Sequence, residues 1–213
     1  MEILELMGKR HSVRQYIKKP IEQEKRNEID RCISEINEES GLNMQVFYDE
    51  PECFNSFMAH YGKFKNVENY IALVGTKKER EKAGYYGEKL VLECQKLGLN
   101  TCWVAITHGK TKAKTEKGQK LLIVIALGYG ETQGVPHKSK SMAELSKADE
   151  NAEWFTKGME AVCLAPTAVN QQKFLFELKN GVVTAKALMG FYSKTDLGIV
   201  KYHFEAVTGH KVK

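Results

Sequence analysis

The sequence predicts an α+β fold, in which amphipathic helices and short apolar strands follow one another along the chain. Apolar side chains recur with helical spacing in several long segments. The unbroken aliphatic run Leu121–Leu127 is typical of a strand buried on both faces. The alternating segment Phe174–Leu178 leads through Asn180-Gly181 into Val182-Val183, a pattern that favours a two-residue hairpin. The chain therefore combines both element types in one fold.

Composition indicates one large globular domain or two small ones. The chain has 213 residues, of which 42% are hydrophobic and 28% charged, ordinary values for a globular protein. Its 32 basic and 27 acidic residues give a formal charge of +5, a mild excess that favours an anionic ligand such as phosphate. The excess is too small to indicate nucleic-acid binding.

Cysteine and histidine usage indicates a reducing compartment and no metal site. Five cysteines are scattered without C-x-x-C spacing, and six histidines never cluster with them at ligand spacing. Charged residues begin at Glu2, and no apolar run reaches membrane-spanning length. We therefore expect a soluble cytoplasmic protein with neither a signal peptide nor a membrane segment.

In the first half of the chain, apolar spacing predicts two helices and three strands. Pro20 is typical of a helix start, and Gly98 of a helix end. Residues 40–45 break the first helix before a strand begins. The predicted elements are a helix over 20–36, strands over 46–48 and 70–74, a helix over 79–97 and a strand over 101–106.

In the second half, the predicted order is strand, linker, helix, hairpin and helix. The buried strand is Leu121–Leu127, and residues 141–147 form the linker. The next helix ends near Ala165, because the residue before a proline is biased away from helical angles. After the hairpin, Asp196 is placed to cap a last helix that Gly209 closes.

An N-terminal basic segment can hold a phosphate group. In an extended chain the side chains of Arg10, Ser12 and Arg14 point the same way, so two guanidinium groups and a hydroxyl converge. Arginine binds phosphate oxygens in a bidentate manner. A solvated basic turn is the alternative, and it is the commoner fate of a single basic run.

The segment Ala165–Gln172 is a polar loop that leaves a buried helix. Thr167, Asn170 and Gln171 or Gln172 can both donate and accept hydrogen bonds without carrying charge. That combination suits a neutral, planar ligand rich in heteroatoms. An ordinary polar connection is an equally good interpretation of these residues alone.

A weak internal repeat relates the two halves. Asn-x-Gln occurs at 43–45 and again at 170–172, each time between a helix and a strand. Ten residues separate Gly87 from Gly98, and ten separate Gly198 from Gly209. The repeat predicts a core with internal pseudo-two-fold symmetry.

These motifs resemble those of the nitroreductase family, whose members bind FMN. The resemblance covers most of the chain and implies an α+β fold with a central, mostly antiparallel sheet flanked by helices. Arg10-x-Ser12-x-Arg14 is similar to the family's phosphate motif, and Ala165–Gln172 resembles its Ala-Pro-Ser-x-x-Asn-x-Gln loop. The residues implied to bind FMN are Arg10, His11, Ser12, Arg14, Trp103, Val104, Ala105, Lys138, Lys140, Pro166, Thr167, Ala168, Asn170 and Gln171.

The order of the motifs departs from the family pattern. There the Ala-Pro-Ser loop follows the first motif closely and is donated by the partner subunit of a homodimer, whereas here it lies in the C-terminal half. We therefore expect a fused pseudo-dimer, with a nitroreductase-like half over 1–145 and a half-repeat over 146–213. Such a chain forms one flavin site alone and is a monomer or a weak homodimer.

The resemblance implies an FMN-dependent oxidoreductase. Electrons pass from NADH or NADPH through FMN to an aromatic acceptor, either a nitro compound or a quinone, and the flavin carries the chemistry without a catalytic side chain. Two alternatives stay open: a flavin carrier or sensor without efficient turnover, and a polyanion-binding module based on the lysine-rich stretch 110–117 and the basic C-terminus. No nucleic acid, membrane or metal is implied.

Overall fold

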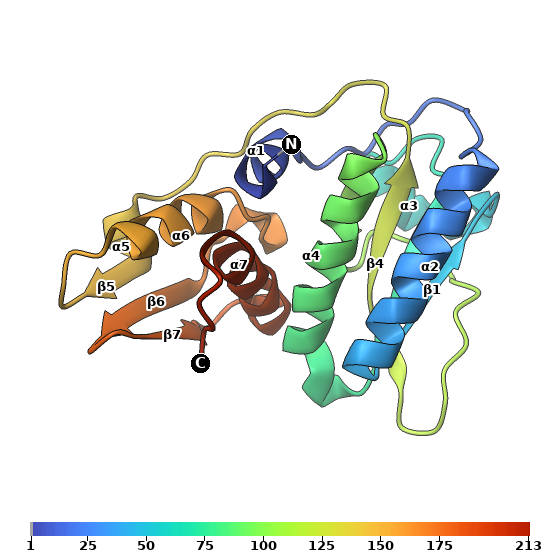
Figure 1. Ribbon diagram of the computed structural model, residues 1–213. Coiled ribbons are helices and arrows are strands. Elements are labelled where there is room, and N and C mark those ends of the chain that lie inside the picture. Colours follow the sequence, from blue (N-terminus) through green and yellow to red (C-terminus); the bar gives the residue numbers. More distant parts are fainter. Residues whose placement is uncertain (1) are drawn as a thin grey trace.

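In the computed structural model, which describes residues 2–213, two lobes meet along a pair of helices (Figure 1). The N-terminal lobe carries a four-stranded sheet, and the C-terminal lobe a three-stranded sheet. The α+β class is confirmed, but the strands form two sheets instead of one central sheet. The N-terminal lobe comprises α2 (Gln23–Ser40), β1 (Asn43–Phe47), α3 (Phe57–Tyr61), β2 (Asn69–Gly75), α4 (Arg80–Lys96), β3 (Asn100–Val104) and β4 (Lys120–Gly128).

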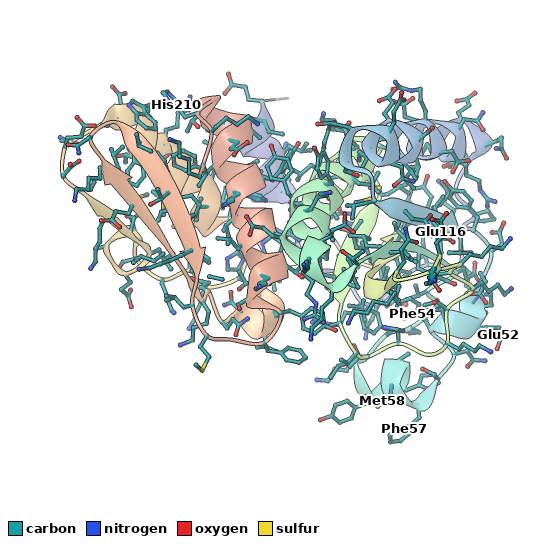
Figure 2. The ribbon with its side chains drawn as sticks, turned by 90° about the horizontal axis from the view of Figure 1, so that it is seen from below. Glu52, Phe54, Phe57, Met58, Glu116 and His210 are labelled. Carbon is teal, nitrogen blue, oxygen red and sulfur yellow. The ribbon has the colours of Figure 1, made fainter. Side chains whose placement is uncertain are left out.

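The first sheet has strand order β1-β2-β4-β3, and every pair of neighbours is antiparallel. Its two central strands are almost wholly buried, since side chains from α2 and α4 pack against one face and aromatic residues such as Phe54 and Phe64 against the other. Burial on both faces agrees with the aliphatic sequence of 121–127. At the rim of this lobe, Phe57 and Met58 project from α3 (Figure 2).

The C-terminal lobe comprises α5 (Met142–Leu145), β5 (Ser146–Ala148), α6 (Glu153–Cys163), β6 (Phe174–Lys179), β7 (Val182–Ala187) and α7 (Ser193–Thr208). The hairpin between β6 and β7 is confirmed, with Asn180 and Gly181 at φ values of 50° and 71°. The linker predicted over 141–147 is wrong. There Ser141 and Glu144 form a capping box for α5, and β5 pairs in parallel with β6.

Helices α4 and α7 lie side by side between the two sheets (Figures 1 and 2). Two glycines permit this close approach. A Cβ at Gly84 would collide with the carbonyl oxygen of Thr195, and one at Gly198 would collide with that of Glu81. Each helix thus presents backbone to the other, and the interface fixes the spacing of the lobes. The short helix α1 (Ile3–Lys9) packs on both helices through Leu6 and other apolar side chains.

The order of elements repeats across the lobes. The series α2, β1, β2, α4 in the first lobe is matched by α6, β6, β7, α7 in the second, although α3 lies between β1 and β2. In each series the two strands pair in antiparallel fashion. Gly98 and Gly209 follow α4 and α7 with φ values of 76° and 71°. This order agrees with the predicted pseudo-two-fold core. The division expected between 145 and 146 stays a prediction; it lies between α5 and β5.

Two helix boundaries differ from the predictions. Helix α2 begins at Gln23, after Pro20, and continues to Ser40, where Gly41 adopts the left-handed conformation. Helix α7 begins at Ser193, so Asp196 lies inside the helix and does not cap it. The carboxylate of Asp196 binds the Ala165–Gln172 loop instead. Within residues 2–213, no helix combines the length and apolarity needed to span a membrane.

Candidate functional site

Two adjoining cavities open where the N-terminal basic segment meets the Ala165–Gln172 loop. We call them the Arg10 cavity, of about 260 Å³, and the Trp103 cavity, of about 100 Å³. Together they reach the lower end of the roughly 300–1,000 Å³ of small-molecule sites. Both are lined by Ser12, Arg14, Pro166, Thr167 and Val169.

The basic segment extends the first sheet beyond β3. Ser12 forms a parallel bridge with Thr101, and the Val13 amide donates to the Thr101 carbonyl at 3.0 Å. Val13 is buried in the core, so its neighbours Ser12 and Arg14 face the other way. Arg10, Ser12 and Arg14 all line the Arg10 cavity, as their alternation predicts.

Arg10 is the most unusual group in this cavity. It is only 3% exposed, and its Nε lies 3.6 Å from Glu88 Oε1, beyond hydrogen-bond distance. Its Nε and Nη1 atoms are buried without a hydrogen-bond partner anywhere in residues 2–213. A buried guanidinium without hydrogen-bond partners is costly, and its positive charge beside the cavity favours an anion there.

Two histidines flank Arg10. Burial first, and the Arg10 charge second, lower the pKa values of both His11 and His137. His137 Nε2 lies 3.1 Å from the carbonyl oxygen of Cys163 at the end of α6. A neutral imidazole has one N–H group, so in His137 the Cys163 carbonyl takes that donor and Nδ1 is left as an acceptor.

The loop after α6 has a strained backbone. Val169 and Asn170 have φ values of 46° and 53°, and Gln172 has 47°. A β-branched residue at positive φ is uncommon and is held only where the surroundings impose it. Val169 is also 86% exposed and lines both cavities. The loop thus presents an apolar side chain at the mouth of the site.

Hydrogen bonds to α7 hold this loop. The Asp196 carboxylate accepts from the Ala168 amide at 2.9 Å and from Gln171 Nε2 at 2.8 Å. Thr167 Oγ1 accepts from the Gln172 amide at 3.1 Å. Burial raises the pKa of Asp196 to about 6. The loop is therefore positioned by a buried acid that sequence analysis assigned to helix capping.

The basic tail at 138–140 contacts the loop chiefly through its backbone. Asn170 Nδ2 donates to the Lys138 carbonyl at 2.9 Å, and the Lys140 amide donates to Gln172 Oε1 at 2.7 Å. Lys140 Nζ lies 3.2 Å from the Gln171 carbonyl. Neither lysine lines a cavity. This tail supports the loop, and the structure does not bring its ammonium groups to Arg10.

The Trp103 cavity has a more apolar lining than the Arg10 cavity. Trp103 and Ala105 face it from β3 and the residue that follows, whereas Val104 points to the opposite side of the sheet and is buried in the core. Trp103 Nε1 donates to Glu88 Oε2 at 2.9 Å. The Tyr192 hydroxyl donates to the Ala105 carbonyl at 3.3 Å and joins the lobes across this cavity.

Most residues implied by the resemblance therefore meet at one place. Val104, Lys138, Lys140 and Gln171 do not line either cavity. Sequence analysis missed several lining residues on α7, because only tertiary packing brings that helix to the site. The implied residues that line a cavity are Arg10, His11, Ser12, Arg14, Trp103, Ala105, Pro166, Thr167, Ala168 and Asn170; the missed ones are Ile123, Val135, His137, Val169, Tyr192, Thr195, Asp196 and Ile199.

The part of the chain that the structure describes contains no group of three or more His, Cys, Asp or Glu side chains that could hold a metal ion.

Comparison with known proteins identifies the family. The family model described as "Putative TM nitroreductase" matches residues 2–208. The chain belongs to the nitroreductase family. Its fold is similar to that of a Thermotoga maritima protein described as a putative nitroreductase, with a TM-score of 0.72, 22% identity and coverage of 97% of this chain and 83% of that one. No curated protein matches the sequence.

Smaller nitroreductase-family structures match only part of the chain. A family member from Streptococcus pneumoniae has a TM-score of 0.52 and 14% identity, and covers 67% of this chain and 98% of its own. A Desulfovibrio desulfuricans protein described as a putative nitroreductase in complex with FMN has a TM-score of 0.52 and 17% identity, with coverage of 66% and 92%. About a third of this nitroreductase therefore lies outside the part that matches them.

Proposed function

We propose that the chain binds FMN in the two adjoining cavities and acts as an FMN-dependent NAD(P)H oxidoreductase on nitroaromatic or quinone acceptors. Family membership supports a flavin oxidoreductase in general. The observation that supports the proposal most directly is Arg10, a buried cation that lines one of the two cavities and has Nε and Nη1 atoms without hydrogen-bond partners in residues 2–213.

The Arg10 cavity fits the phosphate of FMN. The guanidinium groups of Arg10 and Arg14 give charge-assisted donors, and the Ser12 and Thr167 hydroxyls give further ones. His137 lies in the same cavity. A phosphate in this cavity would balance the positive charge of Arg10, whose Nε and Nη1 atoms have no hydrogen-bond partner within residues 2–213.

The Trp103 cavity has the largely apolar lining that suits a flavin ring system, and the ring would also extend into the adjoining Arg10 cavity. Trp103, Ala105 and Ile199 supply apolar walls, and Pro166 and Ala168 border the same space from the loop. Flat heteroaromatic ligands favour such sites, with a few polar groups that fix orientation. Val169, exposed at the mouth, is placed to contact an aromatic acceptor.

When bound, FMN supplies the redox chemistry, so no side chain is assigned as catalytic acid or base. The chain's own residues bind the phosphate, border the ring and limit solvent access. NADH or NADPH is the proposed reductant. A cytoplasmic location, and the absence of nucleic-acid or membrane partners, remain part of the proposal.

We further propose that one chain makes one complete flavin site. The basic segment extends the sheet of the N-terminal lobe, whereas the loop belongs to the C-terminal lobe, and both line the same cavities. The matched element orders and the two-thirds coverage by smaller family members support a fused pseudo-dimer, either monomeric or weakly homodimeric.

Reconstitution of the purified chain with FMN tests the proposal. We expect flavin absorbance that co-purifies with the protein and NAD(P)H oxidation that depends on added nitroaromatic or quinone. Flavin binding without oxidation would contradict the enzyme and favour a carrier or sensor. Absence of flavin binding would contradict both.

A further inference from the structure

A buried hydrogen-bonded cluster lies between the lobes beside the Arg10 cavity. Its centre is Glu88 on α4, which is fully buried. Glu88 Oε2 accepts from Trp103 Nε1 at 2.9 Å, and Oε1 lies 3.0 Å from His203 Nε2 on α7. Arg10 is the third neighbour, at 3.6 Å from Oε1. The cluster thus touches both cavities and both lobes.

The partners of His203 determine the proton content of the cluster. Its Nδ1 lies 2.8 Å from the carbonyl oxygen of Ala161, which can only accept. Its Nε2 faces the carboxyl group of Glu88. Both contacts are hydrogen bonds only if the Glu88–His203 pair holds one proton more than a carboxylate and a neutral imidazole. Either the imidazole is doubly protonated or the carboxyl group is protonated.

In both cases the Glu88–His203 pair carries no net charge. The positive charge of Arg10 is then uncompensated, although a carboxyl group lies nearby. The 3.6 Å separation of Arg10 Nε from Glu88 and the buried, unpartnered Nε and Nη1 atoms of Arg10 agree with this state. A cation left in this state binds an incoming phosphate more strongly than one already paired with a carboxylate.

We propose that His203 is a positioning residue for flavin selection: by neutralising Glu88, it leaves the charge of Arg10 available to the phosphate and makes the site prefer FMN to riboflavin. This inference rests on the proposed flavin site. It assigns the selectivity to a residue that touches neither cavity, because His203 is buried and lines neither of them.

The test compares FMN and riboflavin, which differ only in the phosphate, by fluorescence titration of the apoprotein. In His203→Gln, Glu88 keeps its negative charge and pairs with Arg10. We expect FMN affinity to fall at least tenfold while riboflavin affinity changes less than threefold. Equal loss for both flavins would show a merely structural role and overturn the proposal.

A second variant tests whether the Glu88 charge causes the effect, by asking whether its removal restores the preference for FMN. Glu88→Gln in the His203→Gln background removes the carboxylate that captures Arg10, so we expect the preference for FMN to return to within threefold of the natural chain. Glu88→Gln alone leaves the net charge beside Arg10 unchanged and should also retain that preference. Loss of the preference in either variant would overturn the proposal, even if His203→Gln alone fails to fold.

Glu205→Gln is the matched control. Glu205 also lies on α7 and accepts from the Tyr85 hydroxyl of α4 at 2.9 Å, but it lines neither cavity. We expect both flavin affinities to be unchanged. If the natural chain binds no FMN, the proposed function fails; if it binds FMN and the His203 variants behave like it, only this inference fails.

Discussion

Two clefts differ in the way their charged groups are paired: one is bordered by α7, and the other by both α4 and α7. The cleft formed by the Arg10 and Trp103 cavities contains a buried cation without hydrogen-bond partners. The other, which we call the Tyr85 cleft, is larger, at about 500 Å³. Its lining charges pair with one another: Lys82 with Glu79 at 3.0 Å, Lys201 with Glu81 at 2.7 Å and Lys211 with Glu205 at 2.7 Å.

The comparison shows that volume alone does not identify a site. In the Tyr85 cleft the polar groups already satisfy each other, and a ligand would have to break those pairs. In the Arg10 cavity an anion would balance a positive charge that has no hydrogen-bonded partner in residues 2–213. Residues near the start of α7 line the Trp103 cavity, and residues near the start of α4, together with others of α7, line the Tyr85 cleft.

The largest expected effect comes from Arg10→Met. This variant removes the uncompensated charge, so FMN affinity should fall about 100-fold, which corresponds to roughly 3 kcal/mol of charge-assisted hydrogen bonds. Riboflavin affinity should stay within threefold. Fluorescence titration measures both. Unchanged FMN affinity would show that the uncompensated charge of Arg10 does not distinguish this cleft from the Tyr85 cleft.

Gly198→Ala tests the close packing of α7 against α4. The added methyl group would collide with the backbone of α4 at Glu81 and Tyr85. We expect the free energy of unfolding to fall by about 3 kcal/mol in urea titration. Gly8→Ala in α1 is the control, because a Cβ there meets no atom within 4 Å, and it should be neutral or slightly stabilising. Equal behaviour of both variants would contradict close packing of α4 and α7.

Asp196→Asn tests the buried acid that holds the loop. The raised pKa of about 6, against an ordinary 3.8, means that the folded state binds the proton more tightly than the unfolded state. The stability of the natural chain should therefore fall as pH rises from 4 to 7. In the variant this pH-dependent loss of unfolding free energy, roughly 2 to 3 kcal/mol, should be absent. Parallel pH profiles of unfolding would contradict the raised pKa.

The smallest effect is expected in the Tyr85 cleft. Lys211→Met removes an exposed partner of Glu205, and exposed ion pairs contribute about 0 to 1 kcal/mol. We expect a loss of less than 1 kcal/mol in the same urea titration and no change in FMN affinity. A marked loss of flavin binding would show that the Tyr85 cleft takes part in the site.

Local patterns predicted much of the fold. The alternation at 174–178 and Asn180-Gly181 determine the hairpin, and the aliphatic run 121–127 determines a buried strand. The short elements α5 and β5 were missed because a four-residue helix and a three-residue strand show too few periods of apolar spacing. Two separate sheets were not foreseen either, since strand pairing depends on contacts distant in sequence.

The site was predictable only where one segment supplies several groups. Arg10, Ser12 and Arg14 share a face because an extended chain alternates, and the Pro166 loop follows a helix stop. Val104 illustrates the limit, because the same alternation that presents Trp103 turns its neighbour into the core. The contacts of Asp196 and His203 could not be predicted from the sequence, since they arise where α7 meets α4, α6 and the loop after α6.

The flavin content of the purified protein, measured by absorbance after reconstitution and together with the mass of the particle, tests the central claim most directly. The account predicts one FMN per 24.2 kDa chain, retained when the protein is diluted to single chains. Two FMN molecules per chain, or FMN that is held only when two chains associate, would contradict it.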